Sequence, residues 1–139
     1  MNGTDTVADA LQVVRWGYEA LARADVAGML ALASPDIEVY QSESVPWGGR
    51  HHGHAGLIDF LTGVRAALDS RVEIGELYVA GDEVIQVGRT RGYTAATRTP
   101  FDAPEVHVWR VTDGRIASLA VYVDTDVLHA ALQPATPAG

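Results

Sequence analysis

Apolar residues recur along the first part of the chain with the spacing of an amphipathic helix. The stripe advances by four, three, four and three residues through Val7, Leu11, Val14, Tyr18 and Leu21. Apolar periodicity and boundary residues predict three further helices, over residues 26–33, 55–68 and 125–132. Pro35 follows the second of these, and the residue before a proline avoids helical backbone angles.

Alternating apolar and polar positions predict strands in the rest of the chain. These strands span residues 37–44, 72–79, 83–93, 101–111 and 115–123. Gly81-Asp82 and Asp113-Gly114 separate neighbouring strands and are typical of tight hairpin turns. The segment 44–54 holds Pro, Gly and three His and is expected to be a loop. Helices followed by consecutive antiparallel strands indicate an α+β fold with helices packed on one face of a curved sheet.

The last hairpin allows its two faces to be predicted. If Asp113 and Gly114 form a two-residue turn, Thr112 pairs with Arg115, and opposed residues share a face. One face then carries Val106, Val108, Leu119, Val121 and Val123. The other carries His107, Trp109, Ser118, Ala120, Tyr122 and Asp124. We expect the aliphatic face to pack toward the helices and the aromatic face to form a homodimer interface, where aromatic residues are enriched.

Composition narrows the range of functions. The chain has 139 residues, no Cys and a net charge of −8. An acidic chain is poorly suited to nucleic acid or anionic membranes, and without Cys there are no disulfides or thiolate ligands. No apolar run reaches the length of a membrane span, about 18 residues, and the first residues lack a signal-peptide pattern, so a cytoplasmic protein is expected. We expect one domain over residues 1–132 and a disordered tail over residues 133–139.

The order of elements, together with the segments PWGGRHHG, HVW, DGRI and YVDT, resembles one family. From about residue 7 to residue 132 the chain is similar to the SnoaL-like, ketosteroid-isomerase-related proteins of the nuclear transport factor 2-like superfamily. The resemblance implies a cone-shaped α+β barrel. In it, a bent, mostly antiparallel sheet wraps three N-terminal helices around an apolar pocket. It also implies a homodimer formed through the outer sheet face.

The resemblance also shows which catalytic groups are absent at their usual positions. The steroid-isomerase base falls on Gln41, the oxyanion-binding Tyr falls near Gly17, and the protonated Asp falls on Val106. The inward Asp of polyketide cyclases and limonene-type epoxide hydrolases falls on Val121. Asp124 resembles a structural Asp of the family.

Three other residues are then predicted to carry acid–base chemistry. Glu43 follows Gln41 on the same face of its strand; it either transfers a proton, or it pairs with Arg50 or caps a loop amide. Tyr18 belongs to the helical stripe, and its hydroxyl can donate to a ligand oxygen. His52 lies in the predicted loop, where it acts as a general base or proton shuttle or is a solvated side chain. The predicted substrate-binding residues are Gln41, Trp47, Phe60, Leu61, Val106, Val108, Leu119 and Val121.

Two alternatives remain open. If the faces of the last hairpin are reversed, His107, Asp124 and Arg91 line the pocket as an acid–base set. The function is predicted to be a small cofactor-independent enzyme acting on an apolar, oxygenated molecule, polyketide- or terpenoid-like. It would cyclise or isomerise that molecule, or open an epoxide. The other possibilities are a non-catalytic binding module with the same pocket and a dimeric assembly domain. No metal site is predicted, because neighbouring His side chains in one extended loop (His51, His52 and His54) point apart.

Overall fold

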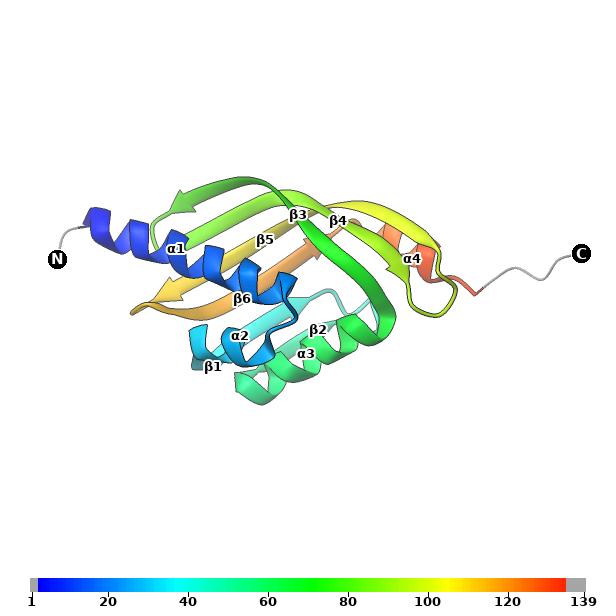
Figure 1. Cartoon of the computed structure of the whole chain (residues 1–139), viewed down its shortest axis with the longest axis horizontal. Coiled ribbons are helices and arrows are strands. Elements are labelled where there is room, and N and C mark those ends of the chain that lie inside the picture. Colours follow the sequence, from blue (N-terminus) through cyan, green and yellow to red (C-terminus); the bar gives the residue numbers. More distant parts are fainter. Residues whose placement is uncertain (1–2, 135–139) are drawn as a thin grey trace, which may run out of the picture.

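The computed structural model describes residues 3–134, with side chains from residue 10 onward, and confirms the predicted α+β class (Figure 1). The helices are α1 (Gly3–Ala22), α2 (Val26–Leu32), α3 (Gly53–Ala67) and α4 (Thr125–Leu132). The strands are β1 (Ala33–Gln41), β2 (Gly49–His52), β3 (Leu68–Ala80), β4 (Glu83–Thr94), β5 (Pro100–Thr112) and β6 (Arg115–Val123). Most of the predicted tail, residues 135–139, lies outside the described residues.

The strands form one six-stranded sheet in the order β2-β1-β6-β5-β4-β3. The β1–β6 pair is parallel and the other neighbours are antiparallel. The short strand β2 corrects the prediction of a loop over residues 44–54. Its four residues pair with the end of β1, so this edge of the sheet reaches α3.

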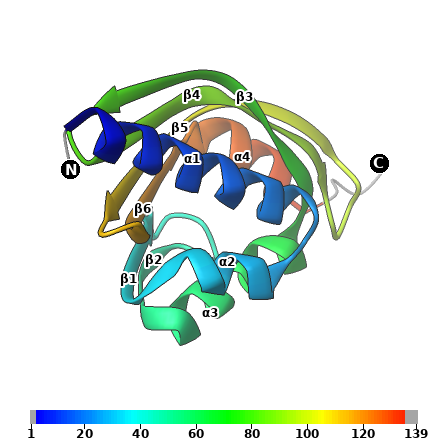
Figure 2. The same cartoon turned by 60° about the vertical axis from the view of Figure 1, so that its left-hand side comes forward.

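The sheet bends over α1, which lies along its inner side (Figure 2). The register of β3 against β4 shifts between Ile74 and Glu76, and this bulge leaves Gly75 unpaired. A Cβ at Gly75 would lie 2.3 Å from the carbonyl oxygen of Val87, so the close approach of the two strands requires glycine here. The bend places the concave faces of β4 and β5 opposite α1.

The β5–β6 hairpin begins as predicted and then departs from the predicted register. Asp113 and Gly114 have φ values of 53° and 76°, as expected for a type I′ turn. Beyond the turn the pairing shifts by one residue, because Ala117 is a bulge between the Val111–Ile116 and Arg110–Ser118 pairs. A shift of one residue exchanges the two faces of a strand relative to its partner.

The predicted face of β5 is therefore wrong, whereas the face of β6 is as expected. His107 now pairs with Val121, and Trp109 pairs with Leu119. His107 and Trp109 are buried on the concave side, at 5% and 0% exposure. Tyr122 stays on the outer side, at 53% exposure.

Two aspartates end the loops that precede short helices. The carboxylate of Asp25 accepts a hydrogen bond from the backbone N–H of Gly28 at the start of α2. The carboxylate of Asp124 accepts from the N–H groups of Asp126 and Val127 at the start of α4. Within the described part of the chain, no helix combines the length and apolar character needed to span a membrane.

Candidate functional site

A cavity of about 870 Å³ lies between the concave face of the sheet and helices α1 and α3. Its wall is largely apolar, and a cavity of this size suits a ligand of drug-like dimensions. Aliphatic and aromatic side chains from α3 and β6 form much of the wall: Leu57, Phe60, Leu61, Val64, Leu119 and Val121. The predicted lining residues Phe60, Leu61, Leu119 and Val121 are thus brought together, as are Gln41 and Trp47.

Four polar side chains form a chain of hydrogen bonds in the wall of this cavity. The indole Nε1–H of Trp109 donates to the Tyr18 hydroxyl at 2.8 Å. That hydroxyl lies 2.7 Å from Nδ1 of His107. On the other side of the imidazole, Nε2 lies 3.0 Å from Oε2 of Glu105. Glu105, His107 and Trp109 alternate along β5 and share its inner face, while Tyr18 comes from α1.

The neighbouring strand β4 determines the tautomer of His107. Gln86 lies opposite His107 in the sheet, and its Oε1 accepts a hydrogen bond from the backbone N–H of Gly75 at 3.4 Å. The amide nitrogen of Gln86 therefore faces Nδ1 of His107, at 3.4 Å. An amide nitrogen only donates, so Nδ1 accepts and the ring hydrogen is on Nε2. The imidazole accordingly accepts from Tyr18 and donates to Glu105.

Burial keeps the Tyr18 hydroxyl protonated. Desolvation raises the pKa of Tyr18 well above its ordinary value of 10.0, although the hydrogen bond from Trp109 acts in the opposite direction. Tyr18 is 6% exposed and its ring packs edge-on against Trp109. The hydroxyl is therefore a permanent donor that holds His107 in one orientation.

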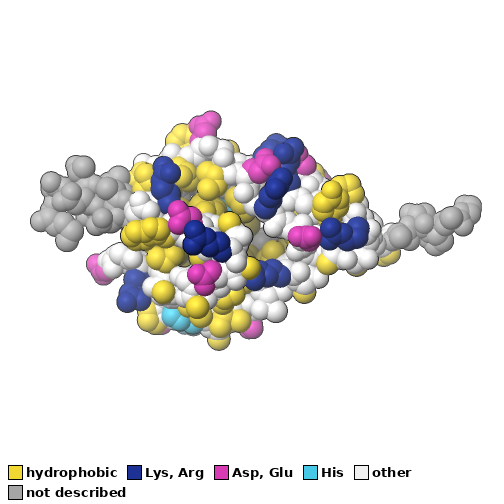
Figure 3. Space-filling view, viewed as in Figure 1, with side chains coloured by type: hydrophobic (Ala, Val, Ile, Leu, Met, Phe, Trp, Pro, Cys, Tyr) yellow, Lys and Arg dark blue, Asp and Glu magenta, His cyan; other side chains and the backbone are white. Residues whose placement is uncertain are grey.

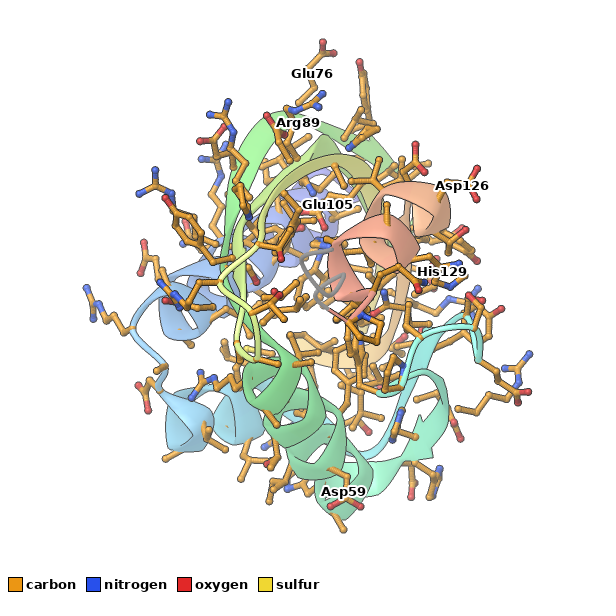
Figure 4. The ribbon with its side chains drawn as sticks, turned by 90° about the vertical axis from the view of Figure 1, so that its right-hand side faces the viewer. Asp59, Glu76, Arg89, Glu105, Asp126 and His129 are labelled. Atoms are coloured by element: carbon orange, nitrogen blue, oxygen red, sulfur yellow. The ribbon has the colours of Figure 1, made fainter. Side chains whose placement is uncertain are left out.

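Glu105 is the only buried carboxylate among the described side chains, at 4% exposure. Figure 4 shows it within the curve of the sheet, whereas Glu76 and Asp126 project away from the molecule. Its Oε2 accepts from His107, while its Oε1 is buried and has no hydrogen-bond partner among the described residues. A buried carboxylate oxygen without a donor is costly to maintain. Because Oε1 is enclosed by the protein, a ligand in the cavity meets it only when the side chains that cover it move aside.

Gln41 presents an amide donor to the same cavity. The indole Nε1–H of Trp47 donates to Oε1 of Gln41 at 2.8 Å. Because an indole N–H only donates, this bond fixes the orientation of the Gln41 amide. The amide nitrogen of Gln41 then has no hydrogen-bond partner among the described side chains. Since it is not among the fully enclosed polar atoms, it is accessible to a ligand in the cavity.

The structure corrects two predicted lining residues, Val106 and Val108. Both are half-buried on the outer face of β5, because the bulge at Ala117 turns their strand by one residue. Glu105, His107 and Trp109 take their place on the inner face.

The predicted catalytic residues Glu43 and His52 do not reach the cavity. The strand β1 ends at Gln41, so Glu43 is an exposed residue of the following turn and forms no ion pair with Arg50. His52 is also exposed, at the end of β2, and its Nδ1 lies 2.6 Å from Glu38. Tyr18 alone of the three predicted catalytic residues lines the cavity.

The alternative set of His107, Asp124 and Arg91 is also separated. His107 faces the cavity, but Asp124 is the exposed N-cap of α4. Arg91 lies on the outer face, where it forms ion pairs with Glu73 and Asp102. The arginine contacts of Asp102, with Arg89 first, lower the pKa of that carboxyl. Both charged groups of the alternative set therefore have structural partners away from the cavity.

The sequence analysis did not assign three residues of the site to the inner face of the sheet: Glu105, Gln86 and Trp109. For Glu105 and Trp109 a sequence signal was present in β5: apolar residues recur at every second position at Phe101, Ala103, Trp109 and Val111, and the structure buries every second residue of this stretch. Extending the alternation over the whole strand would have assigned Phe101, Ala103 and Val111 to the inner face together with Glu105.

The loop histidines do not form a metal site. His51 contacts the carbonyl oxygen of Trp47 and His54 that of Ala33, so their rings point to different partners. Among the described residues, no group of three His, Asp or Glu side chains is arranged to hold a metal ion.

Comparisons with known proteins give a consistent result. A family model described as a SnoaL-like domain matches residues 14–119. An NTF2-like protein from Burkholderia thailandensis is 31% identical, with a TM-score of 0.83, over 90% of this chain and 98% of that chain. An NTF2-like protein of unknown function from Burkholderia pseudomallei is 27% identical, with a TM-score of 0.85, over 91% and 98%. TerC, co-crystallised with polyporic acid, is 26% identical, with a TM-score of 0.83, over 91% and 99%. No curated protein matches the sequence.

Proposed function

The chain belongs to the SnoaL-like family of the nuclear transport factor 2-like superfamily, and on that premise we propose that it is a cofactor-independent acid–base enzyme. Its substrate is an apolar, oxygenated small molecule, polyketide- or terpenoid-like, bound in the cavity between the sheet and α1 and α3. The observation that carries this proposal is the buried carboxylate of Glu105, whose Oε1 has no partner in the wall of an apolar cavity.

Glu105 acts as the base in this proposal, after substrate binding has displaced the side chains that enclose its Oε1. It accepts a proton from a carbon next to a substrate carbonyl. The electron pair of that C–H bond forms a carbon–carbon double bond, and the π pair of the carbonyl moves onto its oxygen, which gives an enolate. His107 donates its Nε2–H to the other carboxylate oxygen and so orients the base. Returning the same proton to a different carbon completes an isomerisation without an oxidant or a cofactor. In a ring closure, the enolate carbon bonds to a second carbonyl carbon of the substrate, the π pair of that C=O moves onto its oxygen, and this oxygen takes the proton.

Gln41 is proposed to hold the substrate oxygen. Its free amide N–H donates to the carbonyl and, more strongly, to the enolate oxygen that develops. In the related steroid isomerases this position is expected to carry the base. Here an amide stands there, and the carboxylate lies on β5, so the positions of base and donor differ from that pattern.

Proton transfer is tested by hydrogen exchange with solvent. The protein is incubated in D₂O with a panel of polycyclic ketones, polyporic acid included, and deuterium uptake at carbon is followed by mass spectrometry. We expect uptake into at least one ligand that binds saturably. Glu105→Gln should reduce this uptake by about 100- to 10,000-fold, the usual contribution of a general base.

A non-catalytic binding module is the second proposed function. It is favoured by the hydrogen bonds that join Trp109, Tyr18 and His107 to one another, because these groups are satisfied without a ligand. Saturable binding of panel members with no deuterium uptake by the wild-type protein would support the module and contradict the enzyme.

We also propose that the chain forms a homodimer through the outer face of the sheet. In the corrected register this face carries a continuous apolar row across β6, β5 and β4, formed by Ala120, Tyr122, Val106, Val108 and Val87. Tyr122 and Val87 are 53% and 42% exposed, and the Tyr122 ring lies 6.2 Å from that of Tyr40. A row of this kind suits the apolar centre of a subunit interface.

A further inference from the structure

The opening of the cavity is lined by charged side chains, in contrast to its apolar interior. Eight of the cavity-lining residues from α1, α3 and β3 are exposed: Gln12, Arg15, Glu19, Ala22, Arg65, Ser70, Arg71 and Ile74. Figure 3 shows a hollow near the middle of this face, with apolar side chains at its base and both arginine and acidic side chains around it. These exposed lining residues mark the side of the cavity that faces solvent.

Three exposed arginines, Arg15, Arg65 and Arg71, belong to the lining of a cavity in an acidic chain. The protein has a net charge of −8, and all ten of its Lys and Arg positions are arginines. Four of the others, Arg89, Arg91, Arg98 and Arg110, each form an ion pair. Among the side chains of residues 10–134, Arg15, Arg65 and Arg71 form none, and neither do Arg23, Arg50 and Arg115, which lie outside the cavity lining. With Glu19 as the one acid in this part of the lining, the opening carries an excess of positive charge.

The charges at the two ends of the cavity have opposite sign. Glu105, with its unpartnered Oε1, lies in the buried wall, and the arginines lie at the opening. A ligand with an anionic group would be repelled by Glu105 and attracted by the guanidinium groups, which bind carboxylates through paired hydrogen bonds. The low-dielectric wall of the cavity strengthens this field at the opening.

We propose that the ligand is an amphipathic carboxylate. Its apolar, oxygenated body occupies the cavity, and its carboxylate is held at the opening by Arg15, Arg65 and Arg71. This inference rests on the proposed function only in placing a small-molecule ligand in the cavity. It fixes the orientation of that ligand, with the reacting carbon toward Glu105 and the carboxylate toward solvent.

The test compares carboxylic acids with their methyl esters. A panel of polycyclic keto acids and the matching esters is titrated against the protein, and binding is followed through the fluorescence of Trp47 and Trp109, which line the cavity. For at least one pair we expect the acid to bind about tenfold more tightly than the ester, a modest value because the arginines are exposed. Added salt should weaken binding of the acid and leave the ester unchanged.

Variants assign this preference to the arginines. Replacing Arg15, Arg65 and Arg71 together by Gln should bring the Kd of the acid to that of the ester. Arg115→Gln, which removes an exposed arginine outside the cavity lining, should leave both values unchanged. The proposal is wrong if no acid in the panel binds more tightly than its ester, or if the triple variant keeps the preference.

The same titrations separate this inference from the proposed enzyme. Glu105→Gln should reduce deuterium uptake by at least about 100-fold but keep the preference for the acid, because the arginines are unchanged. A preference for the acid without any uptake by the wild-type protein would contradict the enzyme and leave the carboxylate site supported. Deuterium uptake into neutral ketones with no preference for acids would support the enzyme and contradict the carboxylate site.

Discussion

Replacing Glu105 by Gln tests whether this carboxylate is held for function at the expense of stability. The substitution keeps the size of the side chain and an oxygen that accepts from Nε2 of His107. It removes a buried charge whose Oε1 has no hydrogen-bond partner among the described residues. A purely structural carboxylate would lose stability on this change, whereas a strained catalytic one would not.

The contacts of Glu105 allow the magnitude to be worked out. A charge-assisted hydrogen bond becomes a neutral one, which lowers the free energy of unfolding by about 1 kcal/mol. The buried, incompletely paired charge of the wild-type carboxylate lowers the free energy of unfolding by several kcal/mol, and the substitution removes this cost. The new amide of Gln has an unpaired N–H in its place, which costs only about 1–3 kcal/mol. We expect the free energy of unfolding to stay the same or to rise by up to about 2 kcal/mol. For a chain of this size that corresponds to a Tm higher by up to about 8 °C.

The assay is urea unfolding followed by circular dichroism, with thermal unfolding as a second readout. Glu105→Ala is the matched comparison, because it leaves the Nε2–H of His107 without an acceptor and should lower the free energy of unfolding by about 1–3 kcal/mol. A loss of more than about 2 kcal/mol in Glu105→Gln, similar to the loss in Glu105→Ala, would refute the reasoning.

Three further predictions concern the hydroxyl, the amide and the outer face. Tyr18→Phe should lower stability by about 1–3 kcal/mol, since it removes a buried hydroxyl that both accepts and donates. The fold raises the pKa of Tyr18, so the contribution of its hydroxyl to stability is complete below pH 10.0, the ordinary tyrosine value, and is lost as the pH rises above it. The free energies of unfolding of the wild type and Tyr18→Phe, measured by urea titration, should therefore converge above pH 10.0. A difference between them that stays constant with pH would contradict the burial argument. Gln41→Leu should weaken binding of ketones by about 10-fold while leaving the matching hydrocarbons unaffected, as isothermal titration would show, and equal effects on both would exclude a hydrogen bond. Val106→Arg should convert the proposed dimer to a monomer in analytical ultracentrifugation, whereas a dimer that survives the change uses another surface.

Periodicity was sufficient to predict most of the fold, because burial on one side is a local property of a helix or strand. The apolar stripe through Val14 and Tyr18 predicts α1, and the Asp113-Gly114 pair predicts the last turn. The short strand β2 was missed. Its Gly and His content is typical of a loop, and only pairing with β1 makes it a strand.

The site was harder to predict, because one unpaired residue decides which side chains face the cavity. The bulge at Ala117 has no sequence signature as strong as a turn, yet it places Glu105 and His107 inside and Val106 outside. Counting from the turn carried the error along the whole strand. The end of β1 caused a similar error in the predicted site. The sequence analysis continued the alternation two residues too far and placed Glu43 on the same face as Gln41, but the strand ends at Gln41.

The central claim, that Glu105 is the base of this cavity, is tested most directly by the deuterium uptake rates of two variants with the same chemical change. Glu105→Gln alters the buried carboxylate, and Glu43→Gln alters an exposed one in the turn after β1. With a ketone that the wild-type protein exchanges, we expect uptake to fall by at least about 100-fold in Glu105→Gln and to be unchanged in Glu43→Gln. Undiminished uptake in Glu105→Gln, or an equal loss in both variants, would contradict the account.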